Sequence, residues 1–117
     1  MKKTKKHINR PPEPHWQELV QVWFDFTRAK FSGPPSFDGS APRDLRNIII
    51  QLRKRCETKG ITWDELTAKK RLYLFLRAAY DVEWLRSHWT LFNINRQKDI
   101  IFLNAANNAL YNTHTHS

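Results

Sequence analysis

The sequence has little of several residue types, and each shortage excludes a class of protein or site. Its single cysteine, Cys56, excludes an intramolecular disulfide and a structural metal site built from cysteines. Its three glycines form no dinucleotide- or phosphate-binding fingerprint. No apolar stretch follows the basic N-terminus as a signal peptide requires, and none approaches the run of about 18 apolar residues that spans a membrane. We therefore expect a soluble cytoplasmic protein that does not bind membranes.

Acidic side chains are also scarce. The 117 residues include 11 Asp and Glu against 20 Lys and Arg, which gives a formal net charge of +9. Such an excess favours a polyanionic partner, either nucleic acid or an acidic protein. The same excess also keeps a small protein soluble, so the charge indicates a class of partner and no single one.

Aromatic residues are plentiful, and apolar residues recur at the spacing of helix faces. Five Trp and seven Phe supply a core for one domain, and no strand-type alternation persists. The pattern predicts an all-α, single-domain bundle of four to five helices. The expected helices cover residues 14–31, 41–58, 62–80, 82–89 and 94–109.

The ends of these helices carry recognisable signals. Thr62 and Glu65 fit a capping box at the start of the third helix, and Asp81 is placed to cap the fourth. The glycine- and proline-rich segment between the first two helices reads as a loop, in which Phe37 is expected to anchor on the core. We expect a flexible basic arm at residues 1–13, a helical domain at 14–110 and a polar tail at 111–117.

The predicted core follows from the same spacing. We expect the third helix to turn Leu66 inward as well, and the fourth to contact the core through Trp84. The other expected core residues are Trp16, Leu19, Trp23, Phe37, Leu45, Ile48, Ile49, Leu52, Leu72, Phe75, Leu76 and Trp89.

No constellation of residues indicates catalysis. The five histidines include no pair at the four-residue spacing of a helix-borne metal site, and the acidic residues are scattered. Cys56 lies on the apolar face of its predicted helix, where a thiol acts as a small inert hydrophobe. We therefore expect no enzyme activity, no metal and no cofactor.

The basic segments carry the functional prediction. Residues 43–59 hold six basic and two acidic side chains, a net charge of +4, whereas a solvated helix face usually mixes both signs. A solvated face remains the alternative to phosphate contact. The residues predicted to bind nucleic acid, with DNA as the expected form, are Lys2, Lys3, Lys5, Lys6, Arg43, Arg46, Arg53 and Lys54.

A second hypothesis is a protein-interaction adaptor or a phage-type regulator that binds an acidic partner, for instance a replication protein. Ile50 favours it, because this apolar residue is expected to be exposed on the charged side of the second helix, and interfaces surround apolar anchors with charge.

Two stretches resemble a known helical module. They are "LVQVWFDFTRAKFSGPPSFDGSAPRDLRNIIIQLRKRC" and "LYLFLRAAYDVEWLRSHWTLFNINRQKDIIF", with a P.F.G loop at Pro35, Phe37 and Gly39 and an N-I-N turn at residues 93–95. The arrangement is similar to the C-terminal module of phage and bacterial, particularly Bacteroidetes-type, replication-initiation or helicase-loading proteins. The resemblance covers about residues 16–104 and implies a helical appendage that takes part in DNA replication.

Overall fold

The computed structural model describes the backbone of residues 13–32 and 37–115, and the side chains of those residues up to 106. This part of the chain forms six helices and no strand, which confirms the all-α prediction. The helices are α2 (Trp16–Lys30), α3 (Ala41–Thr58), α4 (Glu65–Tyr80), α5 (Glu83–Ser87), α6 (Leu91–Arg96) and α7 (Lys98–Thr115).

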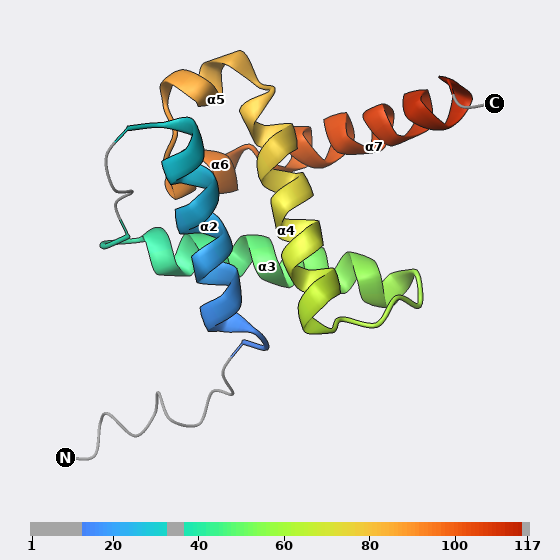
Figure 1. The fold of residues 1–117 in the computed structure, drawn as a ribbon, viewed down its shortest axis with the longest axis horizontal. Helices are drawn as coiled ribbons and strands as arrows, with labels where there is room; N and C mark the ends of the chain where they lie inside the picture. The colour runs from blue at the N-terminus through green and yellow to red at the C-terminus, as the bar shows by residue number, and fades with distance from the viewer. Residues whose placement is uncertain (1–12, 33–36, 116–117) are drawn as a thin grey trace.

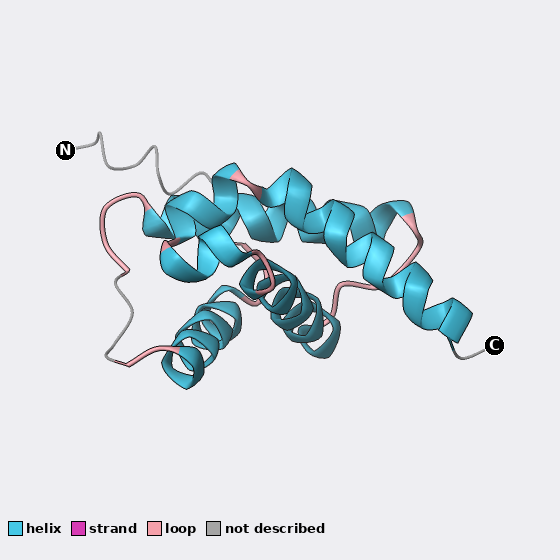
Figure 2. Cartoon of the chain, turned by 90° about the horizontal axis from the view of Figure 1, so that it is seen from above, coloured by secondary structure: helices cyan, strands magenta, loops and turns pink. Residues whose placement is uncertain are grey.

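Helix α4 is the centre of the arrangement and contacts α2, α3, α5 and α7. Figure 1 shows α2 and α4 upright and α3 crossing behind them, with α5 and α6 near the top and α7 leaving the body toward the right. Seen from above in Figure 2, α2 and α4 point along the line of view while α3 and α7 run across it. The molecule is therefore two upright helices laid over two crosswise ones.

Two of the predicted caps are wrong. Asp64 caps α4, since its carboxylate accepts a hydrogen bond of 2.8 Å from the backbone N–H of Thr67, and the helix starts two residues later than the Thr62 box predicts. Asp81 does not cap α5. Its backbone is helical and ends α4, so Val82, in an extended conformation, precedes α5 instead. Neighbouring polar residues compete for a cap, and the tertiary path of the chain decides between them.

The last predicted helix is two helices. Thr90 is extended and its hydroxyl accepts from the N–H of Asn93 at 3.1 Å, which starts α6 ahead of the expected position. Gln97 ends α6 with a non-helical backbone, and α7 then begins at Lys98. The backbone of α7 continues to Thr115, beyond the predicted end at 109.

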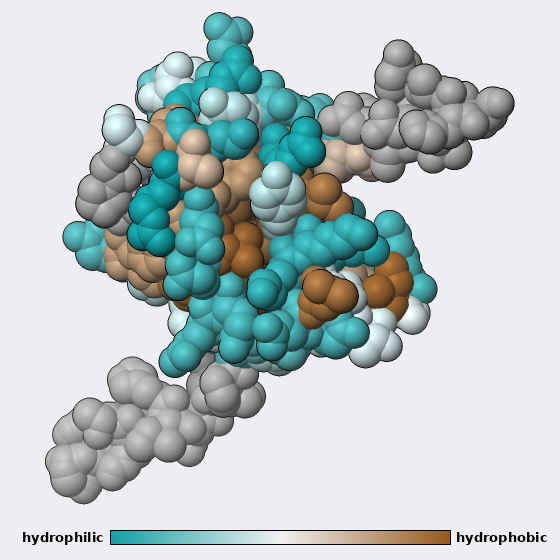
Figure 3. Space-filling model, in the orientation of Figure 1, coloured by the Kyte–Doolittle hydropathy of each residue, from teal (hydrophilic) through white to brown (hydrophobic). Residues whose placement is uncertain are grey.

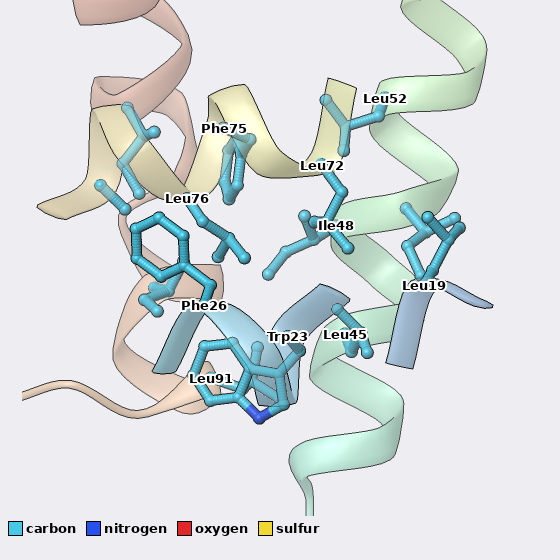
Figure 4. Close-up of a cluster of buried hydrophobic side chains, with 14 of the residues drawn as sticks. Leu19, Trp23, Phe26, Leu45, Ile48, Leu52, Leu72, Phe75, Leu76 and Leu91 are labelled. Atoms are coloured by element: carbon cyan, nitrogen blue, oxygen red, sulfur yellow. The ribbon is translucent and has the colours of Figure 1, made fainter. Parts of the chain in front are cut away.

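The core lies where α2, α3, α4 and α6 meet (Figure 4). The buried residues among those predicted are Leu19, Trp23, Leu45, Ile48, Ile49, Leu52, Leu72, Phe75 and Leu76, while Trp16, Phe37 and Trp89 pack against them partly buried. Burial of one such aliphatic or phenyl side chain contributes about 1.5 to 3 kcal/mol. Cys56 is buried on the same face of α3, as predicted.

Trp89 joins the segment after α5 to α2. Its ring stacks against Trp23, Phe26 and Phe31 at centroid distances of 5.4 to 5.9 Å. Its indole N–H donates a hydrogen bond of 3.0 Å to the hydroxyl of Thr27. A partly buried indole gains most when both its ring and its N–H find partners, so this contact holds the short helices on the body.

The loop aromatic behaves as the sequence predicts. Phe37 packs against Trp16 and Phe24 of α2, with ring centroids 6.4 and 5.5 Å apart. The loop before α3 is thereby fixed on α2, at the side where α3 begins.

Two predicted core contacts are wrong. Leu66 is 78% exposed, because it precedes the buried Ala68 by two residues and therefore lies about 200° round the helix from it. Trp84 is 47% exposed and stacks on its neighbour His88 at 4.1 Å, since α5 buries only Leu85.

Candidate polyanion-binding groove

The structure separates the residues predicted to bind nucleic acid. Lys2, Lys3, Lys5 and Lys6 lie outside the described residues. Arg43 and Lys54 are exposed, and because they stand eleven residues apart they share the outer side of α3 at a spacing of about 16 Å.

Arg46 and Arg53 point to a different side of α3, toward α2 and the chain before it. The guanidinium carbon of Arg46 lies 5.2 Å from the centroid of the Trp16 ring. Arg53 donates from Nε to the carboxylate of Glu13 at 2.9 Å, and from Nη1 to Glu57 at 3.4 Å. These two arginines therefore have structural partners of their own.

The pKa of Arg53 is raised above its ordinary value, first by the hydrogen bond with Glu13 and then by the charge of that carboxylate, although burial acts in the opposite direction. Two carboxylates thus compensate the charge of Arg53. A phosphate would have to compete with both of them, so Arg53 is a poor contact for a polyanion.

A groove opens on another side of α3, between its C-terminal half, α4 and the first half of α7. It has a volume of about 470 Å³. Figure 3 shows the indentation at the right of the molecule, below α7, with hydrophilic side chains along its lower edge. The apolar lining is Leu52, Leu74, Phe75, Ala78, Phe102, Ala105 and Ala106, and the charged lining is Arg55, Lys59, Arg71, Arg77 and Asp81.

The local sequence explains how the lining mixes the two kinds of residue. Arg55 lies near the buried Leu52 on α3, and Lys59 follows four residues later, directly after the helix ends. On α4, Arg71, Phe75 and Ala78 follow the same spacing. Each helix therefore carries a basic edge next to its apolar face, and the packing of α4 on α3 brings the two edges to one groove. We call Arg55, Lys59, Arg71 and Arg77 the rim cations.

Arg55 is held across the groove by α7. Its guanidinium carbon lies 3.8 Å from the centroid of the Phe102 ring, which is a close cation–π contact. Phe102 itself packs on Phe75 of α4 at 5.0 Å. The cation is thus positioned by an aromatic pair rather than by a carboxylate.

The rim cations have no carboxylate partner within the described part of the chain. All 11 Asp and Glu fall within the described residues. The ion pairs found there join Arg28 to Asp25, Arg53 to Glu13 and Glu57, and Lys69 to Glu65.

Other acidic residues are also engaged away from the groove. Asp44 accepts hydrogen bonds from Ser40 and Asn95, and Asp64 caps α4. Asp81 is the one acidic residue among those that line the groove. The groove consequently has a strong excess of positive charge at its rim.

None of the rim cations is among the nucleic-acid-binding residues predicted from the sequence. Arg55 and Lys59 carried a usable signal, because they stand four residues apart at the end of the helix predicted over residues 41–58. Arg46 stands nine residues before Arg55 and so lies about 180° round α3 from it, which the grouping by sequence overlooked. No pattern in the sequence predicted that α4 and α7 would lie beside this end of α3.

Other kinds of site find no support in the described residues. Nowhere in that part of the chain do three His, Cys, Asp or Glu gather as a metal ion would require. None of the described helices is both long enough and apolar enough to span a membrane.

No protein-family model matches this sequence, and neither does any curated protein or solved structure. The resemblance to replication proteins therefore stays a prediction, and the groove has to be interpreted from its own chemistry.

Proposed function

We propose that this protein is a non-catalytic nucleic-acid-binding factor that contacts the phosphate backbone through the rim cations. The observation that carries the proposal is the convergence of Arg55, Lys59, Arg71 and Arg77 on one groove, with no carboxylate partner among the described residues. Cations that neutralise phosphates release condensed counterions, which favours binding of any nucleic acid.

The residue types suit this role. Three of the four rim cations are arginines, whose guanidinium forks match two phosphate oxygens at once. Arg55, Arg71 and Arg77 project from helices of 18 and 16 residues, so these three charges keep a defined spacing. Low sequence specificity is expected, because contacts to phosphate position a protein without reading bases.

A part in DNA replication, in the cytoplasm, belongs to the same proposal. Its support is the resemblance of residues 16–104 to the replication-protein module, together with the basic charge of the chain. The exposed Arg43 and Lys54 would then extend the contact along the outer side of α3.

A second candidate function is an adaptor for an acidic protein. The apolar lining of the groove favours it, because Leu74 is 47% exposed at the edge of that lining. Ile50, the anchor predicted from the sequence, is only partly exposed and adds nothing to this candidate.

Two double variants with the same change of charge test the proposal. Arg55→Glu with Arg71→Glu reverses two rim cations. Lys69→Glu with Lys70→Glu makes the same change of charge at two exposed residues of α4 that do not line the groove. Binding of labelled DNA is measured by fluorescence anisotropy at several salt concentrations, after circular dichroism has shown that both variants fold.

We expect the rim variant to lose binding and the control to keep most of it. For a single strand, the slope of log K against log salt should become shallower by about 1.4 in the rim variant, or about 0.7 for each phosphate that is no longer neutralised. Equal losses in the two variants would mean that only the net charge matters. Absence of salt-dependent binding by the wild-type protein would overturn the proposal altogether.

A further inference from the structure

Resting on the proposed function, we infer that the groove takes single-stranded nucleic acid, with an unpaired base on the apolar lining and its phosphates on the rim cations. The lining that carries this inference consists of Leu52, Phe75, Ala78, Phe102 and Ala105, and it lies between the basic edges of α3 and α4. Charge alone would bind a duplex equally well, so the apolar part needs an explanation of its own.

The geometry of the two nucleic-acid forms separates them. In a duplex the bases are stacked inside and the phosphates face outward, so the protein meets the backbone first. A single strand can turn a base away from its neighbours and into a recess while its phosphates stay at the rim. A groove with an apolar interior and a cationic rim matches the second form.

The Arg55–Phe102 pair offers stacking partners for that base. The guanidinium carbon lies 3.8 Å from the ring centroid and Arg55 is exposed, so a cation and an aromatic ring stand together at the groove. Bases stack on guanidinium planes as well as on aromatic rings. Every base has such a face, which agrees with binding of low sequence specificity.

Small residues leave room for the base. Ala78 of α4 and Ala105 of α7 both line the groove, and the volume of about 470 Å³ lies within the range of roughly 300 to 1,000 Å³ typical of pockets that hold small ligands. An acidic peptide with apolar side chains is the competing occupant. The Arg55–Phe102 pair favours a base over it, because bases stack on both guanidinium planes and aromatic rings.

The first test leaves the protein unchanged. Wild-type protein is titrated with a labelled oligothymidylate, with an abasic strand of the same length, and with a duplex. The abasic strand keeps the phosphates and lacks the bases. We expect it to bind about tenfold more weakly than oligothymidylate, which is the loss that one stacked base implies, and we expect the duplex to bind no better than the abasic strand.

The second test fills the groove. Ala105→Trp occupies the lining and keeps all four rim cations, while Leu103→Trp places the same ring at a position of α7 that is 60% exposed. We expect Ala105→Trp to bind oligothymidylate only as well as the wild-type protein binds the abasic strand, with the salt slope unchanged. Leu103→Trp should bind like the wild-type protein. Thermal unfolding of both variants shows whether α7 still packs.

The outcomes separate this inference from the proposed function. If oligothymidylate and the abasic strand bind alike while the rim variant still loses affinity, the phosphate site stands and the base site is wrong. If a glutamate-rich peptide with apolar side chains binds more tightly than oligothymidylate and Ala105→Trp abolishes that binding, the groove is a protein-docking site. Either result would overturn the inference.

Discussion

Glu13 and Arg53 form an ion pair of 2.9 Å between the chain that precedes α2 and the middle of α3. Glu13 keeps only 7% of its surface exposed, although the sequence analysis placed it at the end of a flexible arm. The pair fixes the start of α2 on α3, so residue 13 already belongs to the structured body.

We predict that Glu13→Gln destabilises the protein by about 1 to 3 kcal/mol, because Arg53 loses its strongest partner while part of its guanidinium stays out of water. Urea unfolding followed by circular dichroism measures the loss. Glu18→Gln makes the same charge change at an exposed residue of α2 and should shift the free energy of unfolding by less than about 0.5 kcal/mol. Equal shifts in the two variants would show that the Glu13–Arg53 pair contributes nothing specific.

Asp64 makes the start of α4 sensitive to pH. Its hydrogen bond with the N–H of Thr67 lowers the pKa of the carboxyl below the ordinary aspartate value. The folded protein therefore holds this proton less tightly than the unfolded chain does. The stabilisation is present at neutral pH and is lost as the pH falls through the lowered pKa.

We predict that Asp64→Ala destabilises the protein at pH 7, and that the difference from wild type becomes smaller as the pH is lowered toward 3. Free energies of unfolding at a series of pH values measure this. Glu65→Ala, one residue later and exposed, should show a weaker dependence, since Glu65 has only a loose pair of 3.9 Å with Lys69. A difference for Asp64→Ala that grows in acid would contradict the cap.

Leu66 and Leu72 test the orientation of α4. Leu72 is fully buried and Leu66 is 78% exposed on the same helix. We predict that Leu72→Ala costs about 2 to 5 kcal/mol, because it leaves a cavity in the core, while Leu66→Ala stays within about 0.5 kcal/mol of wild type. Thermal or urea unfolding of the two variants measures the loss of stability at each position. Comparable losses at both positions would mean that α4 is rotated relative to the structure.

The bounds of the helices could largely be predicted from the sequence alone. The range of α3, Ala41–Thr58, agrees with the prediction, because an apolar stripe at three- and four-residue spacing is a local property. The same spacing correctly predicted nine of the buried core residues. Caps were less predictable, since Thr62 and Asp64 are both good capping residues, and the choice between them depends on where the chain approaches α4.

The residues of the candidate site could not be predicted in the same way. Arg46 and Arg53 looked like free cations in the sequence, and the structure gives one an aromatic ring and the other two carboxylates. Glu13 is 40 residues from Arg53, so no local pattern relates them. A charge is available to a ligand only if no distant residue has already paired with it.

The sequence alone determined that this protein is a helical, strongly basic single domain, because helix periodicity and net charge are properties of neighbouring residues and of composition. Tertiary structure decided which cations remain for a partner. The packing of α4 against α3 and α7 brings Arg55 and Lys59 to the same groove as Arg71 and Arg77, around an apolar lining. That juxtaposition depends on how the helices cross, which is settled only when their core faces pack together.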